Sequence, residues 1–119
     1  MTNRSKAKGT AAESAIVAYL KDCGWPHVER RTLNGSADRG DIAGIPGVVI
    51  ESKNVKTITL GTFVDEANKE RDNAGADVGA AWVKRRGKGS PADWYVVMDG
   101  ETFAGLLRAA GYGPNRGAA

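Results

Sequence analysis

The sequence predicts an α/β domain in which a central mixed sheet of about five strands is flanked by helices, in the order α-β-β-β-α-β-β-α. Segments with helical periodicity open, divide and close the chain, and short runs rich in β-branched and aromatic residues lie between them. The length of 119 residues suits one domain with one core. We expect a flexible basic arm over residues 1–9, a single domain over 10–111 and a frayed tail over 112–119.

Three segments are predicted as helices from the spacing of their apolar residues and from their end signals. The first covers 10–24 and the second 62–76, and each begins at a threonine that can act as N-cap. Asp99 is the expected cap of the third helix. Gly24 is the expected end of the first helix, and Gly111 with Pro114 that of the third.

The strands are predicted between these helices. One lies around 28–33, and the next two form a hairpin that turns through the Gly-Ile-Pro-Gly segment at 44–47. The last two are expected within 77–85 and 94–98. Because a helix separates the third strand from the fourth, a right-handed crossover should make these two strands parallel.

Three charged residues on the hairpin are the main functional signal, in the stretch GDIAGIPGVVIESKN. Residues two apart on a strand share a face, so Glu51 and Lys53 point the same way. The expected turn pairs Ala43 with Val49. That register puts Asp41 directly opposite Glu51, on the face that also carries Lys53.

Two facing carboxylates repel by roughly 3 kcal/mol at about 5 Å and an effective dielectric constant of about 20. Three arrangements relieve this repulsion: one carboxyl group stays protonated, a lysine lies between the two, or a divalent cation binds. Clustered hard oxygens favour Mg²⁺ or Mn²⁺. The hairpin therefore indicates a cation site, with protonation and the lysine as the alternatives.

A third acid, Glu13, lies on the apolar stripe of the first predicted helix. It precedes Ile16 by three residues and Leu20 by seven, which places it on the face expected to pack against the sheet. A glutamate there is costly unless it has a partner. It either contributes to the cation site or forms a capping box with the amide of Thr10.

The net charge of +3 is concentrated in three basic clusters, in the N-terminal segment, before the polar loop at 34–40 and in the segment KRRGKG. Clustered cations favour a polyanionic partner, and solvated surface charge is the alternative. The candidate DNA-contacting residues of these clusters and of the loop are Arg4, Lys6, Lys8, Arg30, Arg31, Ser36, Arg39, Lys84, Arg85, Arg86 and Lys88.

The acids and the lysine together resemble the PD-(D/E)XK nuclease superfamily, whose core is a helix followed by a hairpin bearing D and (D/E)-X-K. Glu13, Asp41 and the Glu51-Ser52-Lys53 segment match it, although a glycine replaces the usual proline before the first aspartate. The wider pattern KGTAAESAIVAYLKDCGW…ERRTLNGSADRGDIAG…GVVIESKN resembles the archaeal-type Holliday junction resolvases and similar small phage nucleases. This resemblance covers roughly residues 4–98.

The resemblance implies a restriction-endonuclease-like fold and a metal-dependent, structure-selective DNA endonuclease of recombination and repair. Such an enzyme resolves four-way junctions by paired phosphodiester cuts and acts as a homodimer. Asp41, Glu51 and the main-chain carbonyl of Ser52 would hold Mg²⁺, with Mn²⁺ as a substitute. Glu13 would complete the site directly or through water, and Lys53 would orient the attacking water or stabilise charge on the phosphate.

Two other functions fit the same residues. One is a flap, nicking or single-strand DNA nuclease of phage recombination or repair. The other is a non-catalytic nucleic-acid-binding module whose acids form salt bridges with Lys53 and the arginines. We expect no membrane span, because no apolar run approaches about 18 residues. We also expect no nucleotide cofactor, because no phosphate-binding GxxxxGK[ST] occurs, and a cytoplasmic location.

Overall fold

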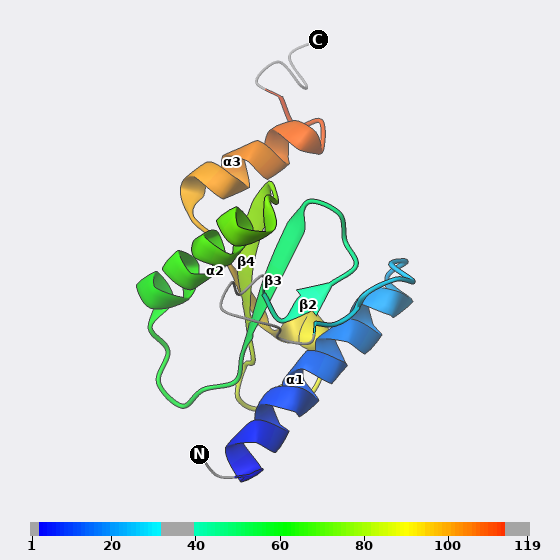
Figure 1. Cartoon of the computed structure of the whole chain (residues 1–119), viewed down its shortest axis with the longest axis vertical. Coiled ribbons are helices and arrows are strands. Elements are labelled where there is room, and N and C mark those ends of the chain that lie inside the picture. The colour runs from blue at the N-terminus through cyan, green and yellow to red at the C-terminus, as the bar shows by residue number, and fades with distance from the viewer. Residues whose placement is uncertain (1–2, 32–39, 114–119) are drawn as a thin grey trace.

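The computed structural model describes residues 3–31 and 40–113, with side chains from Ala7 onward (Figure 1). A five-stranded mixed sheet and three α-helices confirm the predicted class and element order. In chain order the elements are α1 (Asn3–Asp22), β1 (Glu29–Arg30), β2 (Ile42–Ala43), β3 (Val48–Lys53), α2 (Leu60–Ala74), β4 (Val78–Val83), the 3₁₀ turn η1 (Pro91–Asp93), β5 (Tyr95–Val97) and α3 (Gly100–Ala109).

The strands lie side by side in the order β1-β2-β3-β4-β5. All neighbouring pairs are antiparallel except β3 and β4, which are parallel and joined through α2, as the crossover argument predicted. In the hairpin, Ile42 pairs with Ile50. This pair belongs to the predicted register, and Asp41 lies just before β2, with its amide bonded to the carbonyl of Ile50.

The two long helices cover opposite faces of the sheet (Figure 1). On the α1 face, Ile16 and Leu20 pack with Ile42 and Ile50 in the larger buried cluster. On the α2 face, a smaller cluster forms around Phe63 and residues of β4. Successive residues of β3 therefore point to different layers, so Glu51 and Lys53 face α2 while Val48 and Ile50 face α1.

Helix α1 begins at Asn3, so the prediction that a helix starts at Thr10 after a separate arm is wrong. The segment 3–9 continues the helix, because its lysines, arginine and alanine are good helix formers. Thr10 lies in the helix interior. A capping box between Glu13 and Thr10 is therefore excluded.

The second helix also begins earlier than predicted. It starts at Leu60 after Thr59, and Thr62, the predicted cap, lies inside it. It ends at Ala74, two residues before the predicted end, because Gly75 takes the left-handed conformation at φ 64° and caps the helix. The cap of α3 is confirmed, because the side chain of Asp99 accepts a hydrogen bond from the Thr102 amide at 2.8 Å.

Two smaller differences concern the first strand and the ends of the chain. Strand β1 is limited to Glu29–Arg30 within the predicted 28–33, and residues 32–39 lie outside the described part. Of the predicted tail, residues 114–119 also lie outside it. Across 3–31 and 40–113, no helix combines the length and the apolar character that a membrane span requires.

Candidate active site

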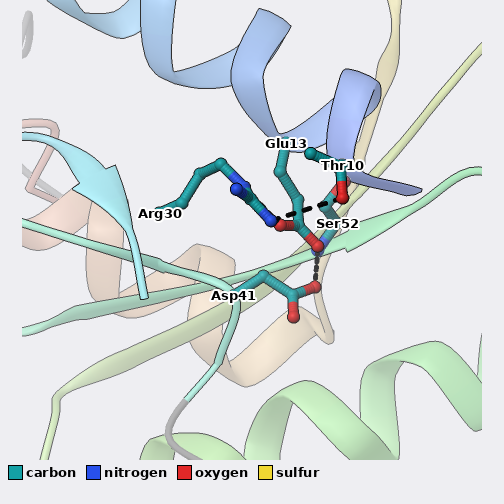
Figure 2. Close-up of polar contacts among 5 residues, drawn as sticks. All are labelled: Thr10, Glu13, Arg30, Asp41 and Ser52. Atoms are coloured by element: carbon teal, nitrogen blue, oxygen red, sulfur yellow. Dashed lines mark hydrogen bonds and ion pairs between the residues drawn. The ribbon is translucent and has the colours of Figure 1, made fainter. Parts of the chain in front are cut away.

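Asp41 is held at the open end of the hairpin by two hydrogen bonds. Its amide donates to the carbonyl of Ile50 at 3.0 Å, and its Oδ2 accepts from the amide of Ser52 at 2.8 Å (Figure 2). The side chain is therefore fixed against the strand that carries Glu51. The amide of Ser52, rather than its carbonyl, is the group that contacts Asp41.

The glycine before Asp41 has a backbone conformation that proline cannot adopt. Gly40 has φ +94°, whereas proline is locked near −65°. A Cβ at Gly40 would lie 2.6 Å from Cγ1 of Val49 and 3.2 Å from the carbonyl oxygen of Ile50. Only glycine fits this backbone position, which brings Asp41 onto the strand.

Glu51 is the most constrained acid of the site. It is 7% exposed, and its Oε2 is buried without a hydrogen-bond partner among the described residues. Burial, side-chain hydrogen bonding with Glu70 and the charges of Asp41 and Glu70 together raise the pKa of Glu51 to about 11. Unless a cation balances these charges, Glu51 carries a proton at neutral pH.

Glu70 is a functional candidate that the sequence interpretation missed. It projects from α2, is 5% exposed and reaches the backbone before Asp41, where a Cβ on Gly40 would lie 3.7 Å from its Oε2. The signal was present in the sequence. Glu70 follows Phe63 by seven residues and Ala67 by three, and both of these are buried. Glu13 was identified as an inward-facing acid by the same kind of spacing to apolar residues of its helix.

Lys53 lies beside these acids and is surrounded by side chains of opposite charge. Its ammonium pairs with Glu66 of α2, lies 3.9 Å from Oε1 of Glu51 and stands 5.3 Å from the ring centroid of Phe63. Burial lowers the pKa of Lys53, but the hydrogen bond to Glu66 and the charge of Glu51 outweigh it and raise the pKa overall. Lys53 is therefore a fixed cation, and Glu66 is a second residue the sequence interpretation missed.

Glu13 occupies the other face of the sheet, because α1 covers the side opposite Glu51. Its Oε1 accepts from Nε of Arg30 at 2.9 Å, and the same guanidinium reaches the hydroxyl of Thr10 at 3.4 Å. The expectation that the helix bearing Glu13 covers Glu51 is therefore wrong. Figure 2 shows the carboxylate of Glu13 beside the guanidinium of Arg30, and the carboxylate of Asp41 joined to the amide of Ser52. A role for Glu13 in metal binding stays a prediction.

The donor set has the chemistry of a hard-cation site. Asp41, Glu51 and Glu70 supply carboxylate oxygens, and one buried oxygen of Glu51 lacks a donor. These residues fit Mg²⁺ or Mn²⁺ chemically. Within the described residues, however, no group of three or more histidine, cysteine, aspartate or glutamate side chains is already arranged around a common point for a metal ion.

The predicted DNA-contacting residues separate into distinct surfaces. Arg30 is engaged by Glu13, and Arg31 lines the hollow beside the hairpin turn. Arg85 stacks over Tyr95, with its guanidinium carbon 5.5 Å from the ring centroid. The side chains of Lys8, Lys84, Arg86 and Lys88 are exposed. The side chains of Arg4 and Lys6, together with Ser36 and Arg39, lie outside the described part of the chain.

Comparison of the chain with protein-family models, with curated proteins and with solved structures finds no significant match. The function is therefore inferred from the residues and their geometry.

Proposed function

We propose that this protein is a metal-dependent, structure-selective DNA endonuclease that resolves four-way junctions by paired phosphodiester cuts. The observation that carries the proposal is the hairpin, where the side chain of Asp41 accepts from the amide of Ser52 beside Glu51, and the ammonium of Lys53 lies 3.9 Å from Oε1 of Glu51. Buried like charges of this kind are costly to a fold that does not use them. Their arrangement matches the acid-acid-lysine order of the nuclease pattern.

Asp41, Glu51 and the main-chain carbonyl of Ser52 would hold the Mg²⁺ ion, which lowers the pKa of a bound water and polarises the scissile phosphate. Lys53 contributes a permanent positive charge whose position is fixed by Glu66. That charge suits a phosphate oxygen as negative charge develops on it during cleavage. Asp41 is kept in place by the Ser52 amide, which limits the movement needed before reaction.

Paired cuts at a symmetric junction require two active sites related by a two-fold axis, so the proposed enzyme is a homodimer. The proposed location is the cytoplasm, where recombination and repair of DNA take place in a bacterial or phage-infected cell.

The proposal is tested by incubating the protein with a labelled four-way junction, a duplex and a single strand, each with Mg²⁺, Mn²⁺ or EDTA. Symmetric paired nicks confined to the junction and abolished by EDTA are the expected result. Cleavage mainly of flaps, nicked duplex or single strands would assign the site to the related nuclease class instead. Absence of cleavage with both metals would refute the proposed nuclease activity.

The Asp41→Asn variant is expected to keep junction binding in EDTA but to lose cleavage by at least about a hundredfold, the scale of losing a group that stabilises the transition state. Asp65→Asn removes an exposed carboxylate of α2 and is the matched control. Cleavage is measured as the single-turnover rate with excess enzyme. Normal cutting by Asp41→Asn would show that the assignment of Asp41 as a metal ligand is wrong.

A non-catalytic nucleic-acid-binding module is the second candidate. It is favoured by the ion pairs of Lys53 with Glu66 and of Glu13 with Arg30, because this function requires the acids only as partners of basic residues. It predicts junction or strand binding with no cleavage in either metal.

A further inference from the structure

A cationic pocket of about 470 Å³ lies at the end of the sheet where β3 and β4 finish. It is lined by Lys8 of α1, by Asn54 and Lys56 after β3, and by Lys84, Arg86 and Gly87 after β4. Three segments distant in sequence therefore converge on one hollow. The linings of this pocket include no aspartate or glutamate.

The basic side chains that line this pocket have no ion-pair partner among residues 7–31 and 40–113. Among the described residues, no ion pair involves Lys8, Lys56, Lys84 or Arg86. Another pocket, of about 410 Å³, shows the contrast, because its lining mixes Arg71 with acids of two segments. Four cations gathered without counter-charges repel one another, and an anion bound between them removes that cost.

The walls of the pocket are tied to the rest of the fold. The amide of Lys84 donates to the carbonyl of Lys53 at 2.8 Å, and Nδ2 of Asn54 donates to the carbonyl of Lys8 at 3.4 Å. The ammonium of Lys84 lies 5.7 Å from the ring centroid of Trp94, which is buried. The indole of Trp94 in turn donates to the carbonyl of Lys88 at 2.8 Å, which fastens the segment between β4 and β5.

The pocket begins one residue beyond the lysine of the candidate active site. Asn54 follows Lys53 directly, and the Lys84 amide is bonded to Lys53 itself. A strand whose phosphate reaches Lys53 would continue into this hollow. Its volume is in the range of sites for small ligands and holds more than a single phosphate group.

We propose that this pocket, with Lys8, Lys56, Lys84 and Arg86, binds the phosphate backbone of the nucleic-acid strand that passes through the active site. The identity of the ligand as a nucleic-acid strand rests on the proposed function. A free phosphate or mononucleotide shares the same chemistry and is distinguished by the test. Contacts of this kind add affinity and set the register of the strand without reading its sequence.

The double variant Lys56→Ala/Arg86→Ala tests the pocket. The matched control is Lys21→Ala/Arg108→Ala, which removes the same charge from exposed positions at the far end of α1 and on α3. Binding of a fluorescent four-way junction is followed by anisotropy in EDTA across a series of KCl concentrations. We expect the pocket variant to lose at least about tenfold in affinity and to lower the salt slope by about 2, and the control to stay within about twofold of wild type.

Equal losses of junction affinity in both variants would show that only net charge matters and would overturn the proposal. No loss of affinity in either variant would also overturn it. Competition by dAMP or inorganic phosphate at matched ionic strength separates the sources of the ligand. Displacement of the junction at submillimolar dAMP or phosphate would assign the pocket to the free anion and overturn the strand assignment. No displacement is the expected result.

Acetylation of the wild-type protein provides a measurement that needs no variant. With the junction bound, we expect Lys8, Lys56 and Lys84 to be protected from an amine-reactive ester, while Lys21 and Lys69 react as in the free protein. Equal protection of all these lysines, or protection of none, would contradict strand binding by the pocket. Every binding measurement is made in EDTA, so failure to cleave in Mg²⁺ would refute the proposed nuclease activity but not strand binding by the pocket. Normal cleavage with no differential protection would refute strand binding by the pocket alone.

Discussion

The acids on the two faces of the sheet differ in burial and in their partners. On the α1 face, Glu13 is matched by Arg30, whose side chain is 45% exposed. On the α2 face, Glu51 and Glu70 are nearly inaccessible and approach each other and Asp41. The first arrangement satisfies its charges within the protein. The second leaves more acid than base in a dry environment.

This difference shows on which face of the sheet a bound cation would stabilise the protein. An exposed ion pair gains little from a further charge, because solvent already screens it. A buried carboxyl pair must keep a proton or bind a positive ion, and Lys53 is already shared with Glu66. The predictions below compare the two faces, beginning with the largest expected effect.

Glu51 is expected to make the protein less stable as the pH rises. Its folded pKa of about 11 lies above the ordinary value, so its contribution to stability is complete below about pH 4.5 and is lost progressively as the pH rises toward 11. One proton corresponds to at most about 1.4 kcal/mol per pH unit. The melting temperature in EDTA should therefore fall between about pH 5 and pH 9, more steeply in wild type than in Glu51→Gln.

Added Mg²⁺ should raise the wild-type melting temperature more at about pH 9 than at pH 6, because the ion takes the place of the proton. Glu51→Gln should lose this pH-dependent increment, whereas Glu29→Gln, a change at an exposed position of β1, should keep it. Identical pH profiles for wild type and Glu51→Gln, measured by calorimetry, would show that Glu51 titrates normally.

The hairpin was predictable because its determinants are local. The Gly-Ile-Pro-Gly turn and the alternation of β3 define the register, and the structure pairs Ile42 with Ile50 accordingly. The helix starts were not predictable from Thr10 and Thr62. Threonine is a common N-cap but also occurs inside helices, where tertiary packing outweighs the end signal.

The partners of the acids were harder to predict than the acids themselves. Periodicity shows that Glu13 lies on the inner stripe of its helix, but it does not show which face of the sheet that helix covers. The structure places α1 opposite Glu51 and brings α2 to it. Glu70 therefore fills the position expected for Glu13, and this assignment depends on the order of the strands as well as on the helix.

Replacing one acid on each face by glutamine tests whether the two faces differ in metal binding. Glu70→Gln should weaken Mg²⁺ binding by roughly tenfold, the scale of losing a supporting group at a metal site, whereas Glu13→Gln should change it by less than about threefold. Titration calorimetry with Mg²⁺ in the absence of DNA measures both variants. The reverse order would move the third carboxylate of the site to the α1 face.

Arg30→Ala should have the smallest effect, on stability alone. It removes the partner of Glu13, whose side chain is 19% exposed and therefore still in contact with solvent, and the ion pair itself lies at the surface because the side chain of Arg30 is 45% exposed. We expect a loss of at most about 1 kcal/mol in the free energy of unfolding, measured by urea denaturation at pH 7. Mg²⁺ affinity should stay at the wild-type value. A loss of several kcal/mol, or a clear fall in Mg²⁺ affinity, would show that the α1 face is coupled to the buried acids and that the contrast between the two faces does not hold.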